Sequence, residues 1–159
     1  MNFSVYADGS SGGGSHAPIG WGWIIVERGL VIAAGNGGAP EGTNNQAELL
    51  AAINGLEALY NLDACHCYEN PTIELVSDSQ YTLGLADGSF SPTLNQDLAE
   101  QIRVLCERMK VKCRWVRGHD GHPIQEMCDK MAKHGKAKFQ PPKEKKNERK
   151  KRRKKLVAP

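Results

Sequence analysis

The chain has 159 residues, of which 40% are hydrophobic, and its 21 Lys and Arg against 18 Asp and Glu give a formal net charge of +3. This is the length of one domain and suffices for a buried core. No stretch approaches the ~20 apolar residues of a membrane-spanning helix, which excludes the integral membrane class. The N-terminus begins as a strand, without the charged and apolar regions of a leader. We therefore expect a soluble cytoplasmic protein, or a nuclear one in a eukaryotic host.

The charge divides unevenly along the chain. Residues 1–142 carry 11 Lys and Arg against 16 Asp and Glu, a net charge of −5, whereas residues 143–159 carry 10 against 2, a net charge of +8. No apolar side chain occurs from Lys143 to Lys155, so we expect this segment to be disordered. The sequence predicts a folded domain over residues 1–140 and a disordered basic tail over residues 141–159.

The five cysteines are odd in number. Cys106, Cys113 and Cys128 stand in segments with helix or strand patterns, which predicts reduced and buried thiols. Cys65-His66-Cys67 contains the ligand types of a zinc site. It lacks the usual two-to-four-residue gap and a second ligand pair, so we expect a solvent-facing loop there.

The first third of the chain has strand patterns. Residues 2–9 alternate between apolar and polar side chains as far as Asp8, and a glycine-rich loop follows over residues 10–15. Two apolar runs, residues 20–27 and 30–36, are joined by Arg28-Gly29, which predicts a β-hairpin.

The middle of the chain alternates between helix and strand. Thr43-Asn44-Asn45 supplies N-cap chemistry for a helix that we expect to run to about Leu59. Residues 61–71 form a predicted polar loop, and residues 72–77 are a short apolar strand. We expect a brief helix after Asp78.

The last part predicts helix, strand and helix. After a loop over residues 87–92, Thr93-x-x-Gln96 has the pattern of a capping box for a helix that runs to about Met109. Residues 111–116 alternate as a strand, and residues 124–134 form a predicted helix that Gly135 ends. The order β-β-β-α-β-α-α-β-α predicts a mixed sheet covered by helices.

Four acidic residues stand in separate short phrases: Asp8 in Tyr-Ala-Asp-Gly-Ser, Glu48 in Thr-Asn-Asn-Gln-Ala-Glu-Leu, Asp78 in Val-Ser-Asp-Ser-Gln-Tyr and Asp129 in Met-Cys-Asp-Lys-Met-Ala. Asp8 and Asp78 end two predicted strands, and sites in open α/β sheets form beyond the carboxyl ends of strands. Converging carboxylates repel one another, and divalent cations relieve the repulsion. Mg²⁺ prefers oxygen ligands, and a pair of such ions is the usual machinery of phosphodiester cleavage.

Each acid also has a plainer interpretation when it is taken alone. Asp8 with the following glycine has the pattern of a turn, and Glu48 that of a helix-surface glutamate. Asp78 with the following serine has the pattern of a helix N-cap. Asp129 stands four residues before Lys133, the spacing of a helical ion pair.

Together with Gly20-Trp21-Gly22 and the phrase from Trp115 to His122, the four phrases resemble ribonuclease H of type 1, from about Asn2 to Gly135. The resemblance implies an α/β ribonuclease H-like fold, with a five-stranded mixed sheet in the order 3-2-1-4-5 and helices on both faces. It implies an endonuclease that hydrolyses the RNA strand of RNA–DNA hybrids, leaving 5′-phosphate and 3′-hydroxyl ends. Two Mg²⁺ ions, for which Mn²⁺ is a possible substitute, would be bound by Asp8, Glu48, Asp78 and Asp129. We expect a monomer without a small-molecule cofactor.

The resemblance also implies roles for neighbouring residues. His119 would shuttle protons, and His122 would support its loop. Thr43 would hold a phosphate of the DNA strand, while the amides of Asn44, Asn45 and Gln80 would contact the minor groove and the 2′-hydroxyls that mark RNA. The alternatives are surface loop histidines, helix capping by Asn44 and a solvated Gln80.

Two departures from the family pattern affect substrate binding. Residues 11–16 replace a loop that usually ends in Asn-Pro-Gly, and no basic helical handle occurs between Tyr81 and Asn95, a stretch without Lys or Arg. The chain thus resembles handle-less bacterial, phage and retroviral members. The tail is the candidate substitute, because its cations would bind nucleic-acid phosphates. A solubility tail and a nuclear address are the alternatives. Its candidate contacts are Lys145, Lys146, Arg149, Lys150, Lys151, Arg152, Arg153, Lys154 and Lys155.

Two other functions compete with this prediction. A DNA nuclease of the resolvase or transposase type would share the fold, but the histidine loop and the set of Asn44, Asn45 and Gln80 argue against it. A non-catalytic nucleic-acid-binding module would be expected to lack a carboxylate, and the sequence lacks none of the four.

Overall fold

The computed structural model describes residues 1–141; the tail residues named above, and with them the predictions made for the tail, lie outside the described residues. The elements follow the predicted order with one addition, the short helix α2. They are β1 (Phe3–Ser11), β2 (Ala17–Glu27), β3 (Leu30–Gly42), α1 (Asn44–Tyr60), α2 (Asp63–His66), β4 (Ile73–Ser77), α3 (Gln80–Ala86), α4 (Gln96–Met109), β5 (Lys112–Trp115) and α5 (Pro123–Ala137).

The strands form one mixed sheet in the order β3-β2-β1-β4-β5, which confirms the predicted topology. β2 pairs antiparallel with β1 and β3, whereas β4 pairs parallel with β1 and β5. The predicted hairpin between β2 and β3 is present. Its two turn residues, Arg28 and Gly29, have φ angles of 48° and 84°, the left-handed conformations of a tight hairpin turn.

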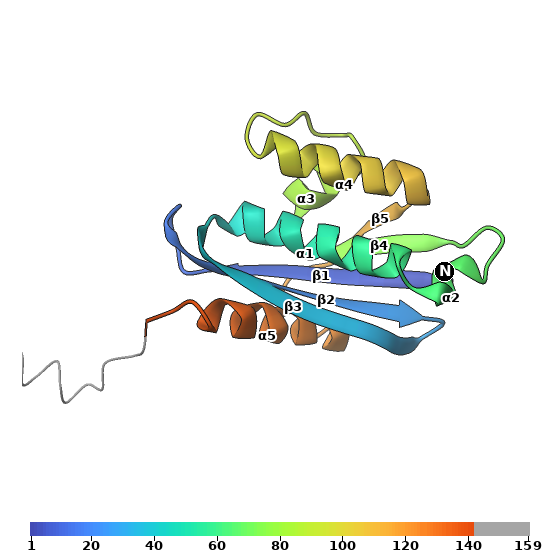
Figure 1. The fold of residues 1–159 in the computed structure, drawn as a ribbon, viewed down its shortest axis with the longest axis horizontal. Helices are drawn as coiled ribbons and strands as arrows, with labels where there is room; N and C mark the ends of the chain where they lie inside the picture. The colour runs from blue at the N-terminus through green and yellow to red at the C-terminus, as the bar shows by residue number, and fades with distance from the viewer. Residues whose placement is uncertain (142–159) are drawn as a thin grey trace, which may run out of the picture.

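Helices cover both faces of the sheet, as predicted. In Figure 1, α1, α3 and α4 lie above the sheet and α5 lies below it. Strand β1 contributes to both layers because successive side chains point to opposite faces. Phe3 and Val5 belong to the core under α1, whereas Tyr6 packs with Ile24 and Cys128 on the side of α5. No helix in the described range is both long enough and apolar enough to cross a membrane.

Helix α5 packs closely on the sheet because glycines of β2, β3 and α5 stand at the contact. A Cβ atom on Gly22 of β2 would stand 2.6 Å from the carbonyl oxygen of Cys128, and one on Gly20 would collide with the backbone at Ala132. Gly135 likewise faces the backbone of Gly37. The prediction that Gly135 ends the helix is therefore wrong: α5 continues to Ala137, and Gly135 serves close packing.

The two predicted helix caps have opposite outcomes. Thr43 caps α1 with a full capping box, in which Gln46 N donates to Thr43 Oγ1 (3.2 Å) and Thr43 N donates to Gln46 Oε1 (2.9 Å). The capping box predicted at Thr93 is wrong. Helix α4 follows Asn95, which has a left-handed conformation (φ 55°) and makes no side-chain cap bond.

The segment predicted as a polar loop over residues 61–71 contains α2, and this helix buries Cys65, so the solvent-facing prediction is wrong for that residue. All five cysteines are free. Cys106 and Cys128 are buried as predicted, whereas Cys113 is only partly buried. Burial raises the pKa of the Cys106 thiol to about 12, which keeps it protonated and unreactive.

Candidate active site

Three carboxylates meet beside the carboxyl ends of the parallel strands β1 and β4. Asp8 lies in β1, Asp78 follows the last residue of β4, and Glu48 lies in the second turn of α1. Each offers a ligand oxygen, and these oxygens lie within 4.8 Å of one another. Residues 40 and 30 positions apart in the chain thus form one oxygen-rich cluster.

The neighbouring glycine lets β1 and α1 approach closely enough to form this cluster. A Cβ atom on Gly9 would collide with the backbone of Ala47 and Glu48. Gly9 N instead donates a hydrogen bond to Glu48 Oε2 at 3.0 Å, which orients this carboxylate toward Asp8. Only 6% of the Glu48 surface is exposed. The plainer interpretations, a turn at Asp8 and a surface glutamate at position 48, are therefore wrong.

Asp78 is contacted by the last residue of β5 and by the loop that follows it. Trp115 Nε1 donates a hydrogen bond to the carbonyl oxygen of Asp78 (3.0 Å). Gly118 leaves no room for a Cβ atom, because such an atom would collide with Asp78 Oδ2. The N-cap of α3 is the next residue, Ser79, whose side chain accepts a hydrogen bond from Thr82 N (3.1 Å).

Asp129 stands apart from the other three acids. It lies on α5, its side chain is 21% exposed, and Lys133 Nζ donates to Asp129 Oδ2 at 2.6 Å, as the plainer interpretation predicts. It does not belong to the group of three within 4.8 Å. It nevertheless lines the same small cavity as Asp8 and Asp78.

The carboxylates disfavour each other's ionised forms. Burial, followed by the charges of Asp78 and Asp129, raises the pKa of Asp8 to about 7. Burial and the charges of Asp8 and Asp78 also raise the pKa of Glu48, and burial raises that of Asp78. A divalent cation would offset this repulsion, and all the ligand atoms are oxygens, so the cluster fits a hard cation.

The cavity beside the carboxylates has a volume of about 10 Å³. His119 lies in the loop that lines one side of the cavity. It is exposed, and its backbone has a left-handed conformation (φ 56°). His122 precedes α5, and its ring packs 5.3 Å from the ring of Tyr6. The cavity is lined by Asp8, Asp78, Arg117, His119, Asp120, His122, Gln125, Glu126 and Asp129.

The predicted substrate-binding residues lie at the starts of two helices next to the acids. Thr43 is the N-cap of α1, and Asn44 and Asn45 are exposed in its first turn, one turn before Glu48. Gln80 is the exposed first residue of α3, two positions after Asp78.

Three residues that position the site were missed by sequence reasoning. Gln46 completes the cap of α1, and the Thr-x-x-Gln pattern at residues 43–46 could have revealed it. Gly118 packs against Asp78, and Gln125 donates from Nε2 to the carbonyl oxygen of Ala7 (3.1 Å). No local pattern signals the last two, because their partners lie in distant segments.

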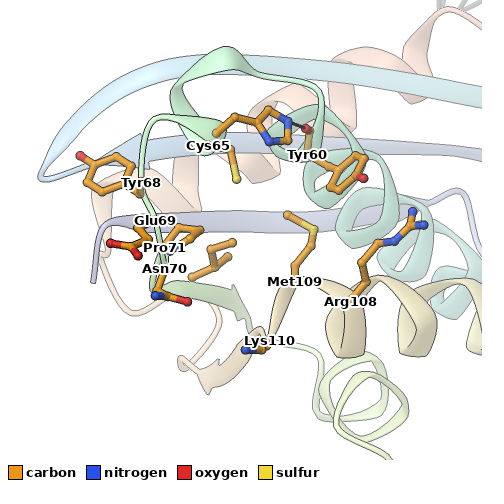
Figure 2. Close-up of a pocket in the computed structure, with 11 residues that line it drawn as sticks. Tyr60, Cys65, Tyr68, Glu69, Asn70, Pro71, Arg108, Met109 and Lys110 are labelled. Atoms are coloured by element: carbon orange, nitrogen blue, oxygen red, sulfur yellow. Dashed lines mark hydrogen bonds between the residues drawn. The ribbon is translucent and has the colours of Figure 1, made fainter.

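A larger cavity lies elsewhere. It has a volume of about 340 Å³ and lies at the amino end of β4, next to Ile73 and the carboxyl ends of α1 and α4. Figure 2 shows Tyr60, Arg108 and Met109 on one side of it and Tyr68 and Glu69 on the other. Glu69 is the one carboxylate among its lining residues, so this cavity does not reproduce the metal-binding chemistry of the acidic cluster.

Comparisons with known proteins identify the family of this chain. A family model described as RNase H matches residues 1–137. A protein named ribonuclease H from Dinoroseobacter shibae is 36% identical, over 89% of this chain and 95% of its own. One from Stutzerimonas stutzeri is also 36% identical, over 86% and 94% of the two chains.

Solved structures show the same fold. RNase H1 from the halophilic archaeon Halobacterium salinarum has 27% identity and a TM-score of 0.64, and the match covers 84% of this chain and 96% of that one. LC11-RNase H1, solved in complex with an RNA/DNA hybrid, has a TM-score of 0.71 at 20% identity, over 86% of this chain and 97% of the other. On the family match and these relatives, this chain belongs to the RNase H family.

Proposed function

We propose that this protein is an endoribonuclease that hydrolyses the RNA strand of RNA–DNA hybrids and leaves 5′-phosphate and 3′-hydroxyl ends. The observation that carries the proposal is the meeting of the Asp8, Glu48 and Asp78 oxygens within 4.8 Å. Family membership and the hybrid complex of the structurally similar LC11-RNase H1 support the choice of substrate.

In this proposal, Asp8, Glu48, Asp78 and Asp129 hold two Mg²⁺ ions, for which Mn²⁺ can substitute. Bound there, the ions would supply activation of water for in-line attack on the phosphodiester and stabilisation of the leaving 3′-oxygen. The pKa of Asp8 is raised because burial and the neighbouring negative charges disfavour its ionised form. A bound cation would offset this repulsion. Lys133 already pairs with Asp129, so a cation bound beside Asp129 would compete with this ion pair for the carboxylate.

In this proposal, His119 moves protons at the reaction centre. Its loop borders the cavity, and its ring is exposed, so it can exchange protons with both solvent and a substrate oxygen. Burial raises the pKa of Asp78, and its charge interaction with His119 acts in the opposite direction. We assign the proton shuttle to His119 and a supporting role to His122, whose ring packs on Tyr6.

Substrate contacts extend from the cluster along the helix starts. Asn44, Asn45 and Gln80 present exposed amides, which can reach minor-groove edges and a 2′-hydroxyl. Thr43 is proposed to bind a phosphate of the DNA strand while it caps α1. The basic tail, over residues 141–159, is proposed to attract the hybrid to a catalytic domain, over residues 1–140, that acts as a monomer.

One gel assay tests the proposal. End-labelled RNA–DNA hybrid, RNA–RNA duplex and DNA–DNA duplex are each incubated with the full chain in MgCl₂ or in EDTA. We expect cleavage of the RNA strand of the hybrid in MgCl₂ alone. Cleavage of the DNA duplex would instead indicate a nuclease of the resolvase type, and no cleavage of any duplex would indicate a binding module.

A further inference from the structure

Two buried polar atoms near the acids have no hydrogen-bond partner. Within residues 1–141, the buried side-chain nitrogen and oxygen atoms that lack a partner are His122 Nδ1 and Gln125 Oε1. Both residues line the small cavity that also contains Asp8, Asp78 and Asp129. Because buried polar groups in folded proteins are almost always satisfied, such orphans indicate an absent partner.

The orientation of the Gln125 amide follows from its other contact. Gln125 is only 4% exposed, and its Nε2 donates to the carbonyl oxygen of Ala7 at 3.1 Å. A backbone carbonyl can only accept, so a flipped amide would place two acceptors against each other. The nitrogen therefore faces Ala7, and Oε1 is the free end of the side chain.

We propose that Gln125 is a positioning residue of the carboxylate site. Through Nε2 it holds the backbone directly before Asp8, and through Oε1 it binds one water molecule inside the cavity. The cavity volume of about 10 Å³ suits a single water. Ionised carboxylates are also acceptors only, so this water can donate one hydrogen to Gln125 and the other to a neighbouring carboxylate.

A glutamine suits this position because it is polar without being charged. Burial and like charges already raise the pKa of Asp8, and another carboxylate in this place would add to the repulsion. An apolar side chain would leave both the Ala7 carbonyl and the water without their partner. This inference rests on the proposed function, since we expect the held water to belong to the hydration of a bound cation.

The test compares Gln125→Met, which keeps the length of the side chain but removes both polar atoms, with Gln101→Met on α4, the same change at an exposed position. Outer-shell changes of this kind typically cost 10- to 100-fold in activity or metal affinity. We expect kcat on a labelled hybrid to fall about tenfold in Gln125→Met, with KM changed less than about twofold. Gln101→Met should match the wild type in both constants.

Two readouts do not depend on turnover. The Tm increase that MgCl₂ causes should be smaller in Gln125→Met than in the wild type, because weaker cation binding stabilises the fold less. A high-resolution crystal structure of the full chain should show an ordered water within hydrogen-bond distance of Gln125 Oε1. If Gln125→Met does not fold, Gln125→Asn replaces it; its shorter amide cannot reach both partners, so the same reductions are expected.

A wild-type kcat together with a wild-type Mg²⁺ response in the folded variant would overturn the inference, as would a crystal structure without that water. Failure of the proposed function looks different: the wild type itself would not cleave the hybrid. The Mg²⁺-dependent Tm increase and the bound water would still test the role of Gln125 in that case.

Discussion

The two ends of strand β4 carry cavities of opposite character. At the amino end, next to Ile73, a cavity of about 340 Å³ contains two tyrosines, two basic residues and one glutamate. At the carboxyl end, the cavity beside Asp78 has about 10 Å³, yet carboxylates from three elements line it and Glu48 adjoins them. The larger cavity has room for a ligand, and the smaller one has the carboxylate oxygens that can bind a cation. In this fold, the cluster of buried carboxylates identifies the candidate site, whereas a choice by cavity volume would select the other end of β4.

The sharpest way to test this comparison is to remove one charge at each end. We expect Asp8→Asn or Asp78→Asn to abolish cleavage of a labelled hybrid, because each removes a metal-binding oxygen from the cluster. Glu69→Gln, the matched change in the larger cavity, should leave kcat and KM unchanged. Activity retained in either aspartate variant would contradict the metal-ligand assignment.

The next effect concerns attraction of the substrate, for which neither cavity supplies a dense basic patch. Residues 1–142 have a net charge of −5, so deletion of residues 143–159 should weaken hybrid binding strongly at moderate salt while leaving kcat and Tm unchanged. Each cation that meets a phosphate contributes nearly one unit to the log–log salt slope, so engagement of half the tail changes the slope by about four or five.

A salt series of KM measures this slope. A tail of equal length, in which every Lys and Arg is replaced by Gln, separates charge from chain length and should behave like the deletion. Equal slopes in the full chain and the deleted one would assign the tail to localisation or to a protein partner.

Histidines at the two ends give a smaller contrast. His119→Ala should lower kcat by roughly 10- to 100-fold, since a proton shuttle contributes less than the metal ions. His66→Ala, in the larger cavity, should have no effect on kcat. His122→Ala is measured in parallel, and a larger kcat defect there, in a protein with an unchanged Tm, would reverse the assignment of the two loop histidines.

The smallest expected effect is on the stability of the metal-free protein. The pKa of Asp8 rises from 3.8 to about 7 on folding, so the folded state holds this proton more tightly. The resulting stability is fully present below about pH 4 and is lost as the pH rises toward 7. In EDTA, the unfolding free energy of Asp8→Asn should therefore fall less than that of the wild type as the pH rises through that window.

Urea unfolding at several pH values between 4 and 8 checks this prediction. Above pH 7, the metal-free Asp8→Asn protein should be more stable than the wild type by about 1 kcal/mol. If the unfolding free energies of the two proteins changed in parallel with pH, the neighbours of Asp8 would not raise its pKa in the folded state.

The order of elements and the sheet topology could be predicted, whereas the details at the helix ends could not. Thr43-x-x-Gln46 and Thr93-x-x-Gln96 share one pattern, but only the first forms a capping box. Tertiary contacts explain the difference. Tyr81 OH donates to the carbonyl oxygen of Leu94 (3.4 Å) and accepts from Asn95 Nδ2 (3.3 Å), which ties the chain before α4 to α3.

The candidate site divides in the same way. Asp8, Glu48 and Asp78 could be proposed from their own phrases, and the structure brings them together. Gln125 could not, because its contact with Ala7 joins residues that are 118 positions apart. Groups that offer ligand atoms leave a mark in the local sequence, whereas groups that orient them depend on the packing of distant segments.

The glycine contact between α5 and the sheet has a consequence for how this protein can change over time. Asp129 lies on α5, and backbone contacts at Gly22 and Gly135, among others, determine the distance between this helix and the sheet. Substitutions elsewhere on β2 or α5 can alter volume and polarity without lifting the helix. We therefore expect substitutions to be tolerated over much of this interface, while an added methyl group at either glycine would displace the helix and, with it, the proposed metal ligand Asp129.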